Sequence, residues 1–124
     1  MRSRLPVVFI GKYEKALKTG QYLAVCGSTR ALGIWDPKKA IKAEEFPRNS
    51  GNWVAKVHVP VDQNVLQWRW MIGSWQNKDE IEWEDTEERE SIVPSDCEKS
   101  VIVSSYGQQL EKMTHSEMVK PGLY

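Results

Sequence analysis

Two segments of this chain alternate apolar and polar residues with the period of two that is typical of a half-buried β-strand. Over residues 53–59, one face carries the large or apolar members, which are Trp53, Ala55, Val57 and Val59. Over residues 65–72, one face carries Leu66, Trp68, Trp70 and Ile72, and the other carries Gln67 and Arg69 with Val65 and Met71. The pattern predicts that Trp68 and Trp70 point into a core and that Arg69 points outward.

Short apolar or β-branched runs predict further strands at 7–10, 22–28, 80–84, 91–93 and 100–104. The segment 32–45 is expected to be a loop with at most one short helical turn, which Asp36 and Pro37 would begin. A chain of 124 residues suffices for one core. We therefore predict an all-β fold with seven to eight strands over residues 5–105, followed by a polar tail or linker over 106–124.

Charge and cysteine content exclude several classes of function. The 17 basic and 17 acidic residues give a formal net charge of zero, so nothing favours a nucleic-acid partner, whereas a neutral polysaccharide fits. The two cysteines, Cys26 and Cys97, lack metal-ligand spacing with His58 and His115, so we predict no metal and no cofactor.

The apolar run LPVVFIG is too short for a secretory h-region or a membrane span. We therefore expect a cytoplasmic protein with no membrane partner and with reduced thiols. A Cys26–Cys97 disulfide is the alternative if the chain is secreted.

The acidic stretch 79–90 raises the question of glycoside hydrolysis, which uses a pair of carboxyl groups. Glu80, Glu82 and Glu84 alternate toward one strand face, as is typical of a solvated surface, and no apolar pocket is indicated that would raise one pKa. The chain also lacks a Gly-rich phosphate loop and a nucleophile–histidine signature. We predict that it is not an enzyme.

Trp35 lies in the loop LGIWDP, where binding residues concentrate and the demands of packing are weak. An indole presents an electron-rich face to the weakly positive C–H groups of a sugar. An exposed tryptophan beside polar side chains therefore indicates a glycan-binding module.

The ordered motifs GQYLAVCGSTRALGIWDPKKAI, an alternating strand led by NW, LQWRW and IEWEDTEERESIVP resemble the starch-binding domain, the family 20 carbohydrate-binding module. The resemblance covers about residues 5–105. It implies an immunoglobulin-like antiparallel β-sandwich without catalytic activity. The implied partners are starch, glycogen and maltooligosaccharides, which are α-1,4-glucans.

The same resemblance implies a sugar site in which Trp35 and Trp83 form a stacking platform and Arg69 donates hydrogen bonds to sugar hydroxyls. The family usually has lysine in place of Arg69, so the geometry of those bonds should differ. Gln67 is a secondary hydrogen-bonding candidate, and Glu88 stands where the family often has asparagine.

The second site of some family members includes a tryptophan that Trp53 matches, but a tyrosine of that site falls near Thr19 here. We therefore do not predict an intact second site, and packing in the core is the other role for Trp53. Trp75 matches no family position, and it could pack over the sandwich edge, widen the sugar platform or contact a partner domain.

A narrower resemblance comes from AVCGS, ALGIWDP, the aromatic-Arg-aromatic triplet 68–70 and the later Ser-Ile-x-Pro and Gly-Gln motifs. These resemble the N-terminal module of glycerophosphocholine phosphodiesterases, which implies that the chain targets an attached catalytic domain to polysaccharide. A laforin-like glycogen phosphatase is another candidate parent. The alternative function is a β-sandwich that has lost sugar binding and docks a protein or its own catalytic domain through Trp35 and Trp75.

Overall fold

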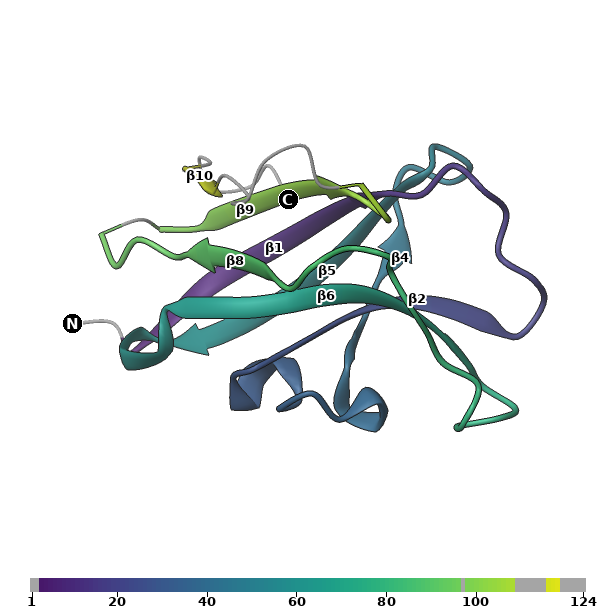
Figure 1. Cartoon of the computed structure of the whole chain (residues 1–124). Coiled ribbons are helices and arrows are strands. Elements are labelled where there is room, and N and C mark those ends of the chain that lie inside the picture. The colour runs from purple at the N-terminus through teal and green to yellow at the C-terminus, as the bar shows by residue number, and fades with distance from the viewer. Residues whose placement is uncertain (1–2, 97, 109–115, 119–124) are drawn as a thin grey trace.

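The computed structural model describes residues 3–96, 98–108 and 116–118, which form two packed β-sheets (Figure 1). The first sheet has the order β10 (Ser116–Met118), β9 (Ser100–Ser105), β1 (Arg4–Lys12), β5 (Asn52–Pro60) and β4 (Glu44–Glu45). The second has the order β3 (Ile41–Lys42), β2 (Gln21–Gly27), β6 (Val65–Ser74) and β7 (Glu82–Trp83), and β8 (Arg89–Ile92) also pairs with β6. All pairs are antiparallel except β1 with β9. The predicted all-β sandwich is confirmed.

Every strand expected from the sequence is present. Three strands were not predicted: β3 and β4, which have two residues each, and β10, which lies within the expected tail 106–124. Two residues are too few for an alternating pattern to be recognised. The short helical turn expected at Pro37 is η2 (Pro37–Lys39), accompanied by η1 (Arg30–Leu32) and η3 (Val61–Gln63). Among the described residues, no helix is long and apolar enough to cross a membrane.

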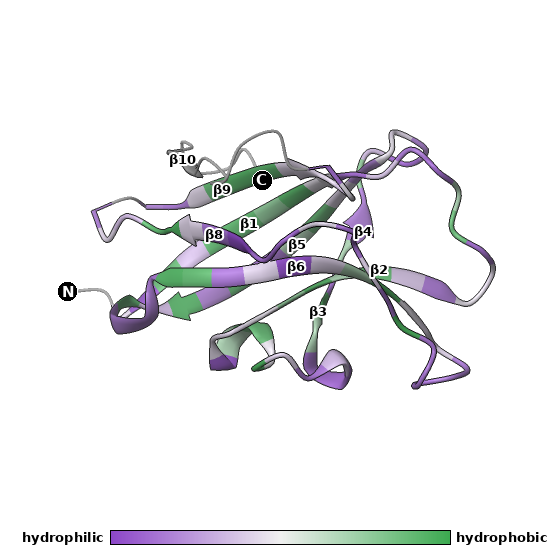
Figure 2. Cartoon of the chain, viewed as in Figure 1, coloured by the Kyte–Doolittle hydropathy of each residue, from purple (hydrophilic) through white to green (hydrophobic). Residues whose placement is uncertain are grey.

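The core lies between the sheets, where the hydrophobic residues of β1, β5 and β6 meet (Figure 2). Trp68 and Trp70 are fully buried, as predicted. The Trp68 Nε1 donates to Ser91 Oγ at 3.0 Å, and the Trp70 Nε1 donates to Ser104 Oγ at 2.7 Å. These bonds satisfy indole groups that would otherwise be costly to bury.

The outer face of the second sheet carries a small apolar cluster of its own. In the register of β2 with β6, Ala24 lies opposite Met71 and Cys26 lies opposite Arg69. Ala24, Cys26 and Met71 are buried together with Ala40, and Tyr22, Ile81 and Trp83 pack against them. The face that carries Arg69 is therefore partly covered by aromatic rings. We call this face the outer face of the second sheet.

Cys26 is a free thiol in this cluster, and Cys97 lies outside the described residues. Burial raises the pKa of the Cys26 thiol to about 11. In a Cys97→Ser variant, Cys26 should therefore resist alkylation by iodoacetamide at about pH 8 while the protein is folded, because the thiolate is the reactive form. Denaturation should make it reactive, as mass spectrometry would detect. Rapid labelling of the native variant would contradict this prediction.

Candidate functional site

The loop after β2 holds Trp35 in an unusual backbone conformation. Three consecutive residues, Gly33, Ile34 and Trp35, have positive φ angles of 89°, 51° and 59°. Only glycine adopts such angles without steric cost, so Ile34 and Trp35 are strained. The Trp35 N–H donates to the Gly27 carbonyl at 2.9 Å, which ties the loop to the end of β2. Strain of this kind concentrates at functional sites, so the loop that carries Trp35 is a candidate part of the site.

Asp36 stabilises the next turn of the same loop. Its Oδ1 accepts a hydrogen bond from the Lys38 N–H at 3.0 Å, and Pro37 occupies the first position of η2. The Asp36 carbonyl lies 3.6 Å from the Cys26 thiol, which donates to it. The loop is thus anchored on both sides of Trp35.

Trp83 lies on β7, directly opposite Met71 of β6. Its ring and the ring of Trp35 have centroids 6.0 Å apart and planes at 62°, and both side chains are partly exposed. The sequence places Trp83 on one strand face with Ile81, which ordinarily argues for burial, and both do pack on the small outer cluster. Because that cluster is small and lies outside the sandwich, it leaves part of the Trp83 ring exposed.

A buried ion pair fixes the segment that follows Trp83. Glu84 accepts from the Arg89 Nε and Nη2 at 2.8 Å each, and the two residues are 3% and 4% exposed. Glu84 also accepts from the backbone N–H groups of Trp70 and Gly107, at 2.9 and 3.0 Å. The Glu84 N–H in turn donates to the Trp70 carbonyl at 3.0 Å. The carboxylate therefore joins the chain after Trp83 to β6.

Arg69 lies on the outer face of the second sheet, two residues before Met71 and opposite Cys26. Its side chain is partly buried, its Nε has no hydrogen-bond partner, and it forms no ion pair with any described residue. The register therefore places the Arg69 side chain beside the strand position that Trp83 adjoins and beside the anchor of the Trp35 loop. A buried donor without a partner calls for an explanation, which makes Arg69 a candidate for ligand contact.

Gln67 is already held by protein groups. Its Oε1 accepts from Ser28 Oγ at 3.1 Å, and its Nε2 donates to Glu90 Oε2 at 3.1 Å. Ser28 and Glu90 were not singled out from the sequence. They meet Gln67 across neighbouring strands, and the register between strands cannot be derived from one amino-acid sequence. Glu88 is exposed, and the structure gives it no hydrogen bond to another candidate residue within the described part of the chain.

Trp53 does not join this group. It lies on β5 in the other sheet, is partly buried and packs against the main core. Its buried Nε1 has no hydrogen-bond partner among the described residues. The structure thus shows the packing that was the other role considered for Trp53, and we do not propose an intact second sugar site there.

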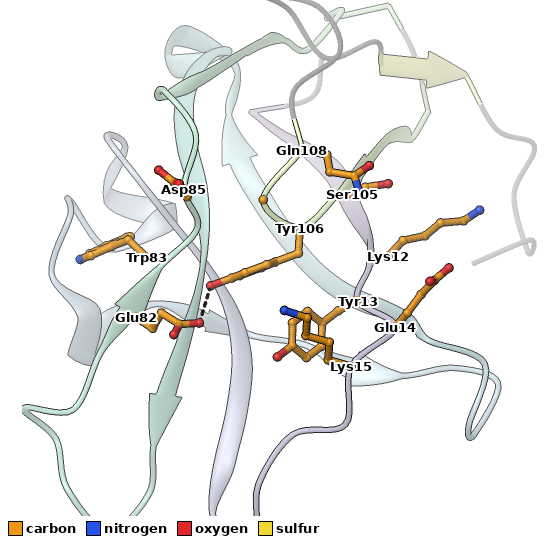
Figure 3. A pocket seen from close by; sticks show the side chains of 11 residues that line it. Lys12, Tyr13, Glu14, Lys15, Glu82, Trp83, Asp85, Ser105, Tyr106 and Gln108 are labelled. Carbon is orange, nitrogen blue, oxygen red and sulfur yellow. Dashed lines mark hydrogen bonds between the residues drawn. The ribbon is translucent and has the colours of Figure 1, made fainter.

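A cavity of about 620 Å³ lies beside β7, between the ends of β1 and β9 (Figure 3). The Tyr106 hydroxyl donates to Glu82 Oε2 at 3.1 Å within it. Burial and the neighbouring Glu82 carboxylate raise the pKa of Tyr106. Glu82 and Trp83 are adjacent on a strand, so their side chains point in opposite directions, and Figure 3 shows the indole directed away from Tyr106.

Comparison with known proteins gives one family match. The family model described as starch binding domain matches residues 4–103, which is most of the chain.

Solved structures with the same fold include a glycoside hydrolase family 15 glucoamylase from Hypocrea jecorina, with a TM-score of 0.74 and 18% identity over 86% of this chain. A gamma-CGTase from alkalophilic Bacillus clarkii has a TM-score of 0.71 and 19% identity over 85%. This chain spans only 18% and 15% of those two proteins. The family 20 module of a maltotetraose-forming amylase from Pseudomonas saccharophila is matched over its full length and 82% of this chain, with a TM-score of 0.68 and 16% identity.

Proposed function

Because the chain belongs to the starch-binding domain family, whose members are non-catalytic carbohydrate-binding modules, we propose that it binds α-1,4-glucan through Trp35, Trp83 and Arg69. One observation carries this proposal. The two partly exposed indoles, with ring centroids 6.0 Å apart, lie on the face that also carries Arg69, whose Nε has no hydrogen-bond partner. Aromatic faces and hydrogen-bond donors on one surface are the two features that sugar recognition requires.

The angle between the rings favours a curved ligand. Planes inclined at 62° cannot both lie flat against a straight, ribbon-like chain. Successive glucose units of an α-1,4-glucan turn relative to one another, so each unit can meet one indole. Arg69 then donates to hydroxyl groups from a fixed, planar fork.

Gln67 and Glu88 have smaller roles in this proposal. Each Gln67 amide atom has one protein partner and can make one more hydrogen bond. Glu88 is exposed, and an ionised carboxylate can accept from a sugar hydroxyl but cannot donate to one. Since each such bond replaces a bond to water, the net gain is small.

The module therefore binds weakly by itself and gains from repeated units along the polymer. This suits targeting of an attached enzyme to starch or glycogen. The sequence motifs support a glycerophosphodiester phosphodiesterase as the enzyme to which the module is attached. The expected location of the protein is the cytoplasm, where glycogen is the glucan that the module meets.

Arg69 provides a test of the hydrogen-bonding part of the site. Arg69→Met keeps an unbranched apolar stem but removes the donors, so we expect about tenfold weaker binding of maltoheptaose. Arg69→Lys restores one charged donor group and should recover most of that loss. Isothermal titration calorimetry measures both. Wild-type affinity in Arg69→Met would remove Arg69 from the site.

The function itself is tested by titrating the wild-type protein with maltoheptaose while recording tryptophan fluorescence. Sugar stacked on Trp35 and Trp83 should change the emission in a saturable way, and amylose should retain the protein in a pull-down. A protein-docking sandwich that has lost sugar binding would show neither response. Cellohexaose, a straight β-linked glucan, serves as the control ligand and should have little effect.

A further inference from the structure

Trp75 is 62% exposed at the end of β6, although large aromatic residues are usually buried. Its ring lies 4.9 Å from the ring of Tyr22, with the planes inclined at 52°. The Lys42 Nζ lies 4.8 Å from the Trp75 centroid and 5.1 Å from that of Tyr22. We call these three residues the Trp75 corner. The ammonium group lies within cation–π distance of both rings, and Trp75 is still largely exposed to solvent.

The backbone of β6 is adapted to this arrangement. Gly73 lies opposite Tyr22 in the register of β2 with β6, and a Cβ at Gly73 would collide with the Tyr22 ring. Glycine therefore lets the tyrosine lie across β6. Tyr22 and Trp83 pack against the same outer cluster, so the Trp75 corner and the Trp35–Trp83 pair share the outer face of the second sheet.

A cavity of about 220 Å³ opens at the corner, lined by Tyr22, Pro37, Lys38, Lys42, Ser74, Trp75 and Lys78. Pro37 and Lys38 belong to the loop that carries Trp35. One loop thus borders both the sugar platform and this cavity. Along β2, Tyr22 lies two residues from Ala24, which is at the register position of Trp83, and four residues from Cys26, which contacts the Trp35 loop. The two places are therefore about 7–13 Å apart along the strand.

The lining suits a sugar. It combines two aromatic rings with the ammonium groups of Lys38, Lys42 and Lys78, none of which forms an ion pair with a described carboxylate. Ammonium groups donate to hydroxyl and ring oxygens. We propose that the Trp75 corner binds glucose units of the same glucan chain, beyond those that stack on Trp35 and Trp83. This inference rests on the proposed function and adds that the site recognises chain length.

The test compares a short with a longer ligand. Maltotriose can cover the Trp35–Trp83 pair alone, whereas maltoheptaose can continue to the corner. By calorimetry, Trp75→Ala should weaken maltoheptaose binding about tenfold, as expected for the loss of a peripheral aromatic contact, and should change maltotriose binding less than about twofold. Trp75→Tyr, which keeps an aromatic face, should retain most of the affinity for maltoheptaose.

The other outcomes separate this inference from the proposed function. If the wild type binds neither sugar, the proposed function fails. If the wild type binds both sugars and Trp75→Ala leaves both affinities unchanged, the corner is not a sugar site. An equal loss for both sugars would also overturn the inference, because it would show an effect on the platform. Thermal melts of each variant establish that it is folded.

Discussion

Trp35→Ala and Trp83→Ala should each abolish measurable retention on amylose. Each removes one of two indoles that together form the platform, and the remaining ring can hold only one glucose unit. Truncating an aromatic anchor of this kind costs about 2 kcal/mol or more, which corresponds to at least roughly thirtyfold in affinity. Since the starting affinity is modest, that loss takes binding below the limit of a pull-down.

The control for Trp35→Ala is Ile34→Ala, on the same strained loop. Ile34 is 57% exposed and also has a positive φ, so its truncation tests the loop without removing an indole. Ile34→Ala should bind amylose like the wild type. Circular dichroism should show all three variants folded. Retention of folded Trp35→Ala or Trp83→Ala at the wild-type level would contradict the platform and favour a protein-docking role.

The long strands could be predicted from sequence because their alternation is imposed by burial on one face. In the segments 53–59 and 65–72, the alternate residues that the pattern assigns to the inner face do pack on the core, and Trp68 and Trp70 are fully buried there. The two-residue strands β3 and β4 could not, since two residues carry no period. The strand β10 lies in a polar segment that has no apolar alternation.

The site was predictable in part. Alternation indicates that Arg69 faces away from the core, and the motifs indicate the two tryptophans. What sequence does not reveal is why Trp83 is partly exposed despite sharing a face with Ile81. The reason is the second, smaller cluster of Ala24, Cys26, Ala40 and Met71 outside the sandwich. Likewise, the positive φ of Trp35 is a property of the folded loop and cannot be derived from residue types.

The buried Glu84–Arg89 pair should dominate the stability of the segment after Trp83. Arg89→Ala leaves the Glu84 carboxylate buried without its cation, which typically costs about 3–5 kcal/mol. Arg89 also donates to the carbonyls of Ser105 and Gln108, at 2.8 and 2.7 Å, so those contacts are lost as well. Urea denaturation followed by tryptophan fluorescence measures the change. Arg48→Ala, at an exposed arginine, should alter the free energy of unfolding by less than about 0.5 kcal/mol.

The double variant Glu84→Leu/Arg89→Met tests whether the uncompensated carboxylate causes this loss. It removes both ions and keeps apolar volume, so it should be more stable than Arg89→Ala alone, because the isolated carboxylate causes most of that loss. It should still bind glucan less well than the wild type. Without the carboxylate, the N–H groups of Trp70 and Gly107 lose their acceptor, and Trp83 is held less firmly against Trp35. Equal stability of the two variants would show that the isolated Glu84 carboxylate is not the main cause of the loss.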